Sequence, residues 1–529
     1  MTEAQTASSD YAPARGSLHL SGILPRTINT RQMAIGIGLS LLFAAFLAAV
    51  QFSTPNLAGN DGYYHIKIAS LMRTEGLTLN FPWLPLTILN HQEFVDHHFL
   101  YHVLLIPFTL GDLVVGAKWA SVLFASFAFL CVWWLLDHQR VVGAPLWALG
   151  TLIVSEAFIF RMSMPRAQSL SLAVLVLALH FALSGKHRLL IPLAFLYTWL
   201  YDGFPLILIV TGAWVAAHWL LKSRLDLRPA AFAGLGIVLG LLFHPYFPDN
   251  LQFLLRHVLP KLVDPTSVSV GSEWFPYNTS QLLENSGLAL VAFMGGTLAL
   301  GLDVRRMNLP TATALILSVA FGFMVFQSRR FIEYFPAIAV IFTALAWSPV
   351  LRRWLDHESQ SGSNHQPARG GSQTWRPRII LAIFGAIMLT GLISNLRASQ
   401  ESMQGSKPNQ RFGEASAWLQ QNTPSGERVF QTDWDDFPRL FFFNTQNTYT
   451  LGLDPTYMQL YDSDLYELWV DLTQGQSDDL SAEVQQFFGA QYAITDLEHT
   501  SFLSAAIEDS NMSEVYRDEF AVIFEIGRD

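Results

Sequence analysis

Residues 33–52 read MAIGIGLSLLFAAFLAAVQF, an apolar run that contains no charged residue. A helix needs about 20 such residues to cross the hydrocarbon core of a bilayer. The polar residues 1–31 precede the run and it carries no small-residue cleavage site, so we interpret it as a membrane helix and not as a removed signal peptide. This stretch therefore predicts a chain that is embedded in a membrane.

The composition of the whole chain supports the same interpretation. Of its 529 residues, 51% are hydrophobic and 14% are charged, whereas soluble domains carry about 25% charged residues. These values exclude a cytosolic enzyme, a disordered protein and a free nucleic-acid-binding protein. The single cysteine, Cys131, lies in an apolar run, so the chain has no disulfide framework.

Ten further apolar runs predict a polytopic α-helical membrane protein with about 11 spans. The run Phe99–Leu110 is too short to span, and we expect a helix that lies in or dips into the outer face. Lys and Arg number 16 in the connections on the side of the N-terminus and 9 on the other side before residue 397. This bias predicts a cytoplasmic N-terminus in a bacterial-type inner (plasma) membrane. The ten runs lie near 114–136, 144–160, 168–184, 189–201, 204–221, 230–245, 285–303, 310–327, 331–348 and 379–396.

The chain is expected to have three parts. Residues 1–31 form a disordered cytoplasmic tail, and residues 397–529 hold 7 Lys and Arg against 23 Asp and Glu. The strand and helix pattern of 397–529 predicts an acidic, extracytoplasmic α/β domain, with strands near 428–432, 448–453, 491–495 and 521–526. Between these parts lies the membrane domain, 32–396, with external loops at 53–113 and 246–284 and a cytoplasmic linker at 349–378.

Ionisable residues close to the predicted spans gather on the outer side. Such groups are costly near a membrane and are functional candidates by default. Their one-sided placement favours chemistry at the outer leaflet over transport, for which polar groups near the midplane or on both sides are expected. For any single residue, a loop charge at a wet interface is the alternative. The group comprises Asp61, Glu75, Glu93, Asp96, Glu156, Asp202, Glu273, Glu333, His65, His97, His98, His244, Arg161, Arg166, Arg329 and Arg330.

The first external loop opens with NDGYYHIKIA at residues 60–69, which predicts an amphipathic helix in the membrane interface. Asp61 either caps this helix or acts as a general base on an acceptor. Farther along the loop, Asp96, His97 and His98 are candidate metal ligands, although adjacent ligands need an irregular backbone and further partners.

A first span followed by a long outer loop with the early pattern Asp61-x-x-Tyr64-His65 resembles the GT-C glycosyltransferases. These polytopic enzymes use lipid-linked sugar donors, and they include oligosaccharyltransferase catalytic subunits, protein O-mannosyltransferases and lipid A aminoarabinose transferases. The resemblance implies that Asp61 serves as base or as the carboxylate that orients the acceptor. It also implies that Tyr64 and His65 lie in the region that binds the acceptor or the sugar.

The segment FRMSMPRAQS at 160–169 is similar in position to the second outer loop of oligosaccharyltransferases, where an Arg precedes an Asp-x-Glu metal motif. Arg161 matches that Arg, but Gln168 and Leu170 stand where the two carboxylates belong. A hard divalent cation prefers carboxylate oxygens, so Arg161 and Arg166 are expected to neutralise a phosphate directly. A divalent metal, Mg²⁺ or Mn²⁺, stays open as a cofactor.

Two later motifs extend the resemblance. The segment SVSVGSEWFP at 267–276 resembles the fifth-outer-loop motif of oligosaccharyltransferases, which implies that Glu273 holds the acceptor with Trp274 beside it. The tail segment TDWDDF at 432–437 loosely resembles their Trp-Trp-Asp-Tyr-Gly motif, so Trp434 and Asp435 are candidates for sugar or acceptor binding. Turn formation is the alternative for these loop acids.

Arg329 and Arg330 lie on the side opposite the cytoplasmic positive loops. They either bind a lipid phosphate or pyrophosphate, or extend toward outer-leaflet head groups.

The predicted function is the transfer of a sugar from a polyprenyl-phosphate or polyprenyl-diphosphate donor to a glycan, lipid or protein acceptor at the outer leaflet. Asp61 is the expected base, Glu273 holds the acceptor, and the arginines bind the phosphate that leaves. The resemblance implies inversion by direct displacement. The bilayer is a further partner, and no nucleic acid is expected. The alternatives from other classes are a non-catalytic membrane scaffold and a transporter of lipid-linked oligosaccharides.

Overall fold

The computed structural model describes residues 30–258, 271–302, 307–363 and 375–527. Nearly all of the predicted N-terminal tail and the centre of the predicted cytoplasmic linker lie outside these residues. The stretch 259–270 of the later external loop, which includes the first part of the motif at 267–276, also lies outside them.

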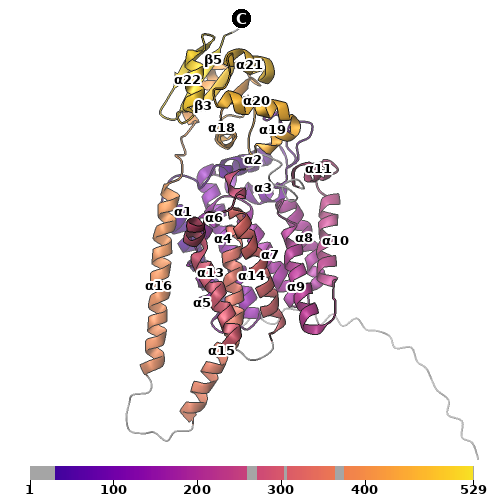
Figure 1. Cartoon of the computed structure of the whole chain (residues 1–529), viewed down its shortest axis with the longest axis vertical. Coiled ribbons are helices and arrows are strands. Elements are labelled where there is room, and N and C mark those ends of the chain that lie inside the picture. Colours follow the sequence, from indigo (N-terminus) through magenta and orange to yellow (C-terminus); the bar gives the residue numbers. More distant parts are fainter. Residues whose placement is uncertain (1–29, 259–270, 303–306, 364–374, 528–529) are drawn as a thin grey trace, which may run out of the picture.

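A helical bundle forms the body of the molecule, and a domain with a β-sheet lies at one end of it (Figure 1). The fully buried small residues Ala117, Ala120 and Ala125 lie on α4, the helix against which α1 and α7 pack. Small side chains at such positions let helix backbones approach closely. The bundle helices are α1 (Thr30–Gln51), α4 (Leu113–His138), α5 (Ala144–Gly150), α6 (Glu156–Ser163), α7 (Gln168–Leu183), α8 (Leu190–Leu200), α9 (Leu206–Lys222), α10 (Arg228–Leu242), α13 (Thr279–Leu302), α14 (Leu309–Gln327), α15 (Phe335–Ser363) and α16 (Trp375–Gln404).

The predicted number of spans is not confirmed. Within the described ranges, five helices are long and apolar enough to cross a membrane, or six if the bent pair α6 and α7 is one span. Several predicted runs form shorter helices because prolines, glycines and polar turns interrupt them. Helices α8, α9 and α10, for example, have 11, 17 and 15 residues. The helical class with several apolar spans and a C-terminal sheet domain is confirmed.

The first external loop lies across the end of the bundle, beneath the sheet domain (Figure 1). Its helix α2 (Asp61–Glu75) was predicted to be interfacial, yet eight of its 15 residues are buried. The packing partners of α2 include α3 (Phe99–Leu105), α4 and a helix of the sheet domain. Asp61 is the first residue of α2 and not its cap, since Asn60 occupies the cap position. The run 99–110 forms α3 and a short 3₁₀ helix (Ile106–Thr109), as expected for a segment that does not span.

The sheet domain confirms the predicted α/β pattern and adds one strand. The five strands have the order β2-β1-β3-β5-β4, in which β1 pairs parallel with β2 and β3, and β5 pairs antiparallel with β3 and β4. The strand that the sequence analysis missed is β4, which alternates little between buried and exposed positions. The strands are β1 (Arg428–Gln431), β2 (Thr448–Tyr449), β3 (Tyr492–Asp496), β4 (Met512–Arg517) and β5 (Ala521–Ile526); the α-helices are α17 (Gly413–Asn422), α18 (Phe437–Phe443), α19 (Thr456–Tyr461), α20 (Ser463–Thr473), α21 (Leu480–Glu483) and α22 (Thr500–Glu508).

A buried arginine joins the sheet domain to the start of α2. Arg439 of α18 donates from Nε to Asn60 Oδ1 at 2.8 Å, and its guanidinium lies 4.3 Å from the centre of the Tyr63 ring. Asn60 in turn donates from Nδ2 to the Asp435 carboxylate at 2.6 Å. A buried guanidinium needs hydrogen-bond partners, and Arg439 finds them at the start of α2. Together with the bond between Asn60 and Asp435, these contacts hold the sheet domain against the residue that precedes Asp61.

Candidate functional site

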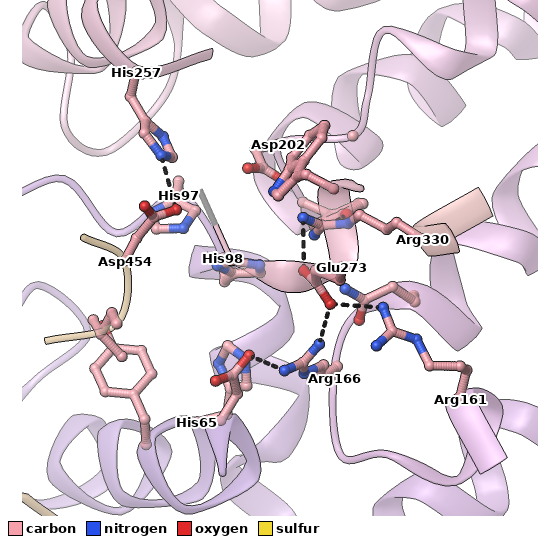
Figure 2. A pocket seen from close by; sticks show the side chains of 18 of the residues that line it. His65, His97, His98, Arg161, Arg166, Asp202, His257, Glu273, Arg330 and Asp454 are labelled. Carbon is pink, nitrogen blue, oxygen red and sulfur yellow. Dashed lines mark hydrogen bonds and ion pairs between the residues drawn. The ribbon is translucent and has the colours of Figure 1, made fainter. Parts of the chain in front are cut away.

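A cavity of about 640 Å³ lies between the bundle and the sheet domain (Figure 2). Segments that are far apart in the sequence line it: α2, the break between α6 and α7, the 3₁₀ helices Ser272–Trp274 and Arg329–Glu333, and loops of the sheet domain. All predicted site residues except Asp96 line the cavity: Asp61, Tyr64, His65, His97, His98, Arg161, Arg166, Glu273, Trp274, Arg329, Arg330, Trp434 and Asp435.

The break between α6 and α7 places two arginines in the cavity. The helices meet at 108°, and Pro165 in the break lies against the first turn of α2. A Cβ added at Gly62 would come within 2.6 Å of Pro165 Cγ, so this approach requires glycine. It brings the Arg166 guanidinium to Asp61, with Nη2 2.7 Å from Oδ2.

Three guanidiniums surround the carboxylate of Glu273, and we call this group the arginine cluster: Arg161, Arg166 and Arg330. Their nearest nitrogen atoms lie 2.8, 3.2 and 3.1 Å from the Glu273 oxygens (Figure 2). Burial alone would raise the pKa of Glu273, but the guanidiniums of Arg330, Arg166 and Arg161 outweigh it and hold this pKa well below its ordinary value. Glu273 is therefore ionised, and it organises the arginines.

Glu333 is a second carboxylate partner of the arginine cluster. Only 1% of its side chain is exposed, and Arg161 Nη2 lies 2.6 Å from its Oε1. Arg161 thus bridges Glu333 and Glu273. The sequence placed Glu333 on the outer side but did not reveal this pairing, since the two residues are 172 positions apart.

The two adjacent arginines have different partners. Arg330 pairs with Glu273, donates from Nη2 to the Tyr201 hydroxyl at 2.8 Å and lies over the Trp274 ring. Arg329 donates from Nε and Nη2 to the backbone oxygens of Phe275 and Pro276, each at 3.3 Å. Its guanidinium also lies 5.5 Å from the centre of the Tyr277 ring, and within the described part of the chain no carboxylate forms an ion pair with it.

The predicted metal triplet Asp96, His97 and His98 is not confirmed. Among the residues that the structure describes, no group of three or more His, Cys, Asp or Glu side chains is arranged to hold a metal ion. Asp96 is turned instead toward His102, whose Nδ1 lies 2.7 Å from its Oδ2. His97 and His98 line the cavity wall, and His97 stacks on Phe253.

A hydrogen-bonded chain of side chains runs from Asp96 to the cavity. His102 Nε2 lies 2.8 Å from His65 Nδ1, so Asp96, His102 and His65 form one series. Because the ionised Asp96 carboxylate accepts from His102 Nδ1–H, the Nε2 atom of a neutral His102 accepts from His65 Nδ1–H. The Nε2 atom of His65 is then an acceptor nitrogen. The sequence analysis missed His102, although its position six residues after Asp96 on a short helix was the available signal.

The segment Asp433–Asp435 of the sheet domain supplies two acids and an aromatic ring to this region. Asp433, Trp434 and Asp435 line the cavity next to Asp61. Burial, with the nearby charges of Asp61 and Asp433, raises the pKa of Asp435 to about 7. A carboxyl group with this pKa exchanges its proton near neutral pH, and Trp434 offers a ring face for stacking.

Comparison with known proteins supports the fold. No protein-family model matches the chain. The chain is 29% identical over 280 residues to dolichyl-phosphooligosaccharide-protein glycotransferase 3 of Archaeoglobus fulgidus. The matched region covers 48% of the chain and 31% of that relative. The chain therefore spans about a third of the length of the curated relative that it matches.

Solved structures with the same fold cover nearly the whole chain. One is the archaeal oligosaccharyltransferase AglB from A. fulgidus with an inhibitory peptide and a dolichol-phosphate, with a TM-score of 0.61 at 15% identity over 90% of this chain and 71% of that chain. Another is ArnT from Cupriavidus metallidurans bound to undecaprenyl phosphate, with a TM-score of 0.52 at 14% identity over 94% and 98%. The predicted resemblance to GT-C glycosyltransferases is confirmed at the level of the fold.

Proposed function

We propose that the chain transfers a sugar from a polyprenyl-phosphate or polyprenyl-diphosphate donor to an acceptor at the outer leaflet. The observation that carries the proposal is one cavity in which four arginines face histidines, carboxyls and aromatic rings. Arginines suit an anionic phosphate, whereas carboxyls and rings suit a sugar or another hydroxyl-bearing group. The relatives support the donor class, because one has dolichol-phosphate bound and another has undecaprenyl phosphate bound.

In the proposed reaction, the bond between the sugar C1 and the phosphate oxygen breaks, and its electron pair stays on the phosphate. A new bond forms between C1 and the acceptor atom on the opposite face, which inverts the anomeric centre. Arg330 and Arg329 receive the charge that develops on the phosphate, and Arg161 adds to the positive potential. Asp61, oriented by Arg166, receives the acceptor and its proton. Preorganised charge of this kind is usually the largest contribution to catalysis.

Glu273 has a changed role in this proposal. The sequence analysis expected it to hold the acceptor, but both of its oxygens already accept from arginines. We assign it the positioning of those arginines.

The test uses the full-length purified chain in lipid nanodiscs with a panel of polyprenyl-linked sugars and peptide, lipid and glycan acceptors. We expect transfer by the wild type and a fall of about 10²–10³-fold for Asp61→Asn. The exposed His91, in the same external loop, provides the matched control His91→Gln, which should retain activity.

Two results would favour another function. Absence of transfer and of donor hydrolysis in the wild type across the panel would favour a scaffold. Movement of lipid-linked sugar across proteoliposome membranes without transfer would favour a transporter.

A further inference from the structure

Arg166 lies between two carboxylates that would otherwise face each other. Its Nη2 is 2.7 Å from Asp61 Oδ2, and its Nη1 is 3.2 Å from Glu273 Oε2. The backbone builds this bridge, since Gly62 allows Pro165 to pack on α2 and Arg166 follows directly. The contact is thus not the chance position of a long surface side chain, and only 15% of the Arg166 side chain is exposed.

The same position is unsuited to a divalent cation. Two carboxylates alone supply few oxygen ligands, and Gln168 and Leu170 replace the carboxylates that an Asp-x-Glu motif would add. A dication between Asp61 and Glu273 would also meet three guanidiniums that already use the Glu273 oxygens. Like charges at such distances repel strongly in a partly buried site. The donor atoms and the local charge at this position therefore do not fit a divalent cation. The Arg166 guanidinium already lies between the two carboxylates.

We propose that Arg166 is a fixed cation that holds Asp61 and Glu273 in register in place of a divalent metal ion. The inference rests on the proposed function, because it states how the acceptor carboxylate is oriented in that reaction. A guanidinium remains charged at all relevant pH values and offers a planar fork that spans two carboxylates. Arg166 is therefore a positioning residue, and charge on the leaving phosphate falls to Arg161, Arg329 and Arg330.

The first test compares metal removal with arginine removal in the full-length chain in nanodiscs. Treatment of the wild type with EDTA, followed by Mn²⁺ or Mg²⁺, should leave transfer unchanged. Arg166→Gly should lower the turnover rate at least 10²-fold, and millimolar guanidinium should restore part of it. Urea, which has nearly the same shape without the charge, should restore nothing. Arg166→Lys retains a charge without the fork and should fall between the wild type and Arg166→Gly.

The second test measures metal binding and does not depend on activity. The wild type should retain no Mn²⁺ at Asp61 after dialysis, whereas Arg166→Asp removes the cation and adds a third carboxylate, so it should retain Mn²⁺. The additional change Asp61→Asn should abolish that retention.

Specific results overturn the inference. Loss of wild-type transfer with EDTA and recovery with Mn²⁺ would do so, as would wild-type Mn²⁺ retention that Asp61→Asn removes. Equal rescue of Arg166→Gly by guanidinium and urea would exclude a role for the charge. A wild type without transfer on any donor would instead contradict the proposed function, and the binding measurement would still decide whether Arg166 excludes a metal.

Discussion

Two carboxyl groups that line opposite sides of the cavity, those of Glu273 and Asp435, have pKa values shifted in opposite directions. In the arginine cluster, Glu273 has three guanidiniums within 3.2 Å, and its pKa is held far below the ordinary value. On the side of the sheet domain, burial and neighbouring acids raise the pKa of Asp435 to about 7 and that of Asp436 to about 8. Burial thus raises the pKa of a carboxyl group, and the three guanidiniums around Glu273 reverse this effect, whereas the pKa of the buried Glu333 stays raised although Arg161 lies 2.6 Å from it.

The difference also separates two tasks in one cavity. The bundle side presents guanidinium groups that carboxylates hold in fixed positions, and guanidinium groups suit an anionic donor. The sheet-domain side presents carboxyls that can exchange a proton near neutral pH, which suit hydroxyl groups.

The largest effect is expected for Arg161→Met. This change leaves Glu333, which is 1% exposed, as a buried carboxylate without its closest cation. Breaking a buried pair in this way costs about 3–5 kcal/mol. Thermal or denaturant unfolding of the purified chain should show this loss.

The matched control is Arg517→Met, which removes an exposed i,i+3 partner of Glu514 in the sheet domain. Exposed pairs contribute about 0–1 kcal/mol, so this change should be nearly neutral. Equal losses in the two variants would contradict the assignment of a stabilising buried ion pair to Arg161 and Glu333.

Gly62→Ala should separate the arginine cluster from α2. The new Cβ would clash with Pro165 and displace the break that positions Arg166 beside Asp61. A displacement of about 1 Å at a reacting centre can lower the rate by about 10²-fold, so we expect slower turnover of a chain that still folds. Gly38→Ala in α1, where nothing lies within 4 Å of the added Cβ, is the control.

The acids of the sheet domain should make stability fall as the pH rises. Their folded-state pKa values exceed those of the unfolded chain, so between pH 4 and about 7 to 8 the unfolded chain has released protons that the folded chain still binds. Each such group contributes a slope of up to about 1.4 kcal/mol per pH unit. Asp436→Asn should flatten the profile, and an unchanged slope in unfolding experiments from pH 5 to 8 would count against this assignment.

The smallest effect is expected for Arg329→Gln. Arg329 lies at the edge of the cavity and pairs with backbone oxygens, so its loss should weaken donor binding without disturbing the cluster. A contact of this kind contributes about 1 kcal/mol, which corresponds to a several-fold fall in kcat/KM for the lipid-linked donor. An unchanged kcat/KM for the Arg329→Gln variant would contradict the proposed contact between Arg329 and the donor phosphate.

The sequence analysis succeeded where the signal was local. Apolar runs and strand alternation predicted the helical class and the sheet domain, and the sequence motifs named 13 of the residues that line the cavity. The predicted span number is not confirmed, because a run of apolar residues does not reveal where a turn divides it. The predicted metal triplet is likewise not confirmed, because the Asp96 carboxylate pairs with the side chain of His102 and with the backbone N–H of His98.

Composition and hydrophobic periodicity are properties of the chain itself, so the sequence was enough to predict a membrane protein with its polar groups gathered at one end of the helices. Which charges meet depends on the tertiary structure. In the sequence, Arg166 lies about a hundred residues after Asp61 and about a hundred residues before Glu273. The three residues meet because of a bent helix pair, one glycine and a docked sheet domain. Ion pairing acts over a few ångströms in space and leaves no periodic trace along the chain.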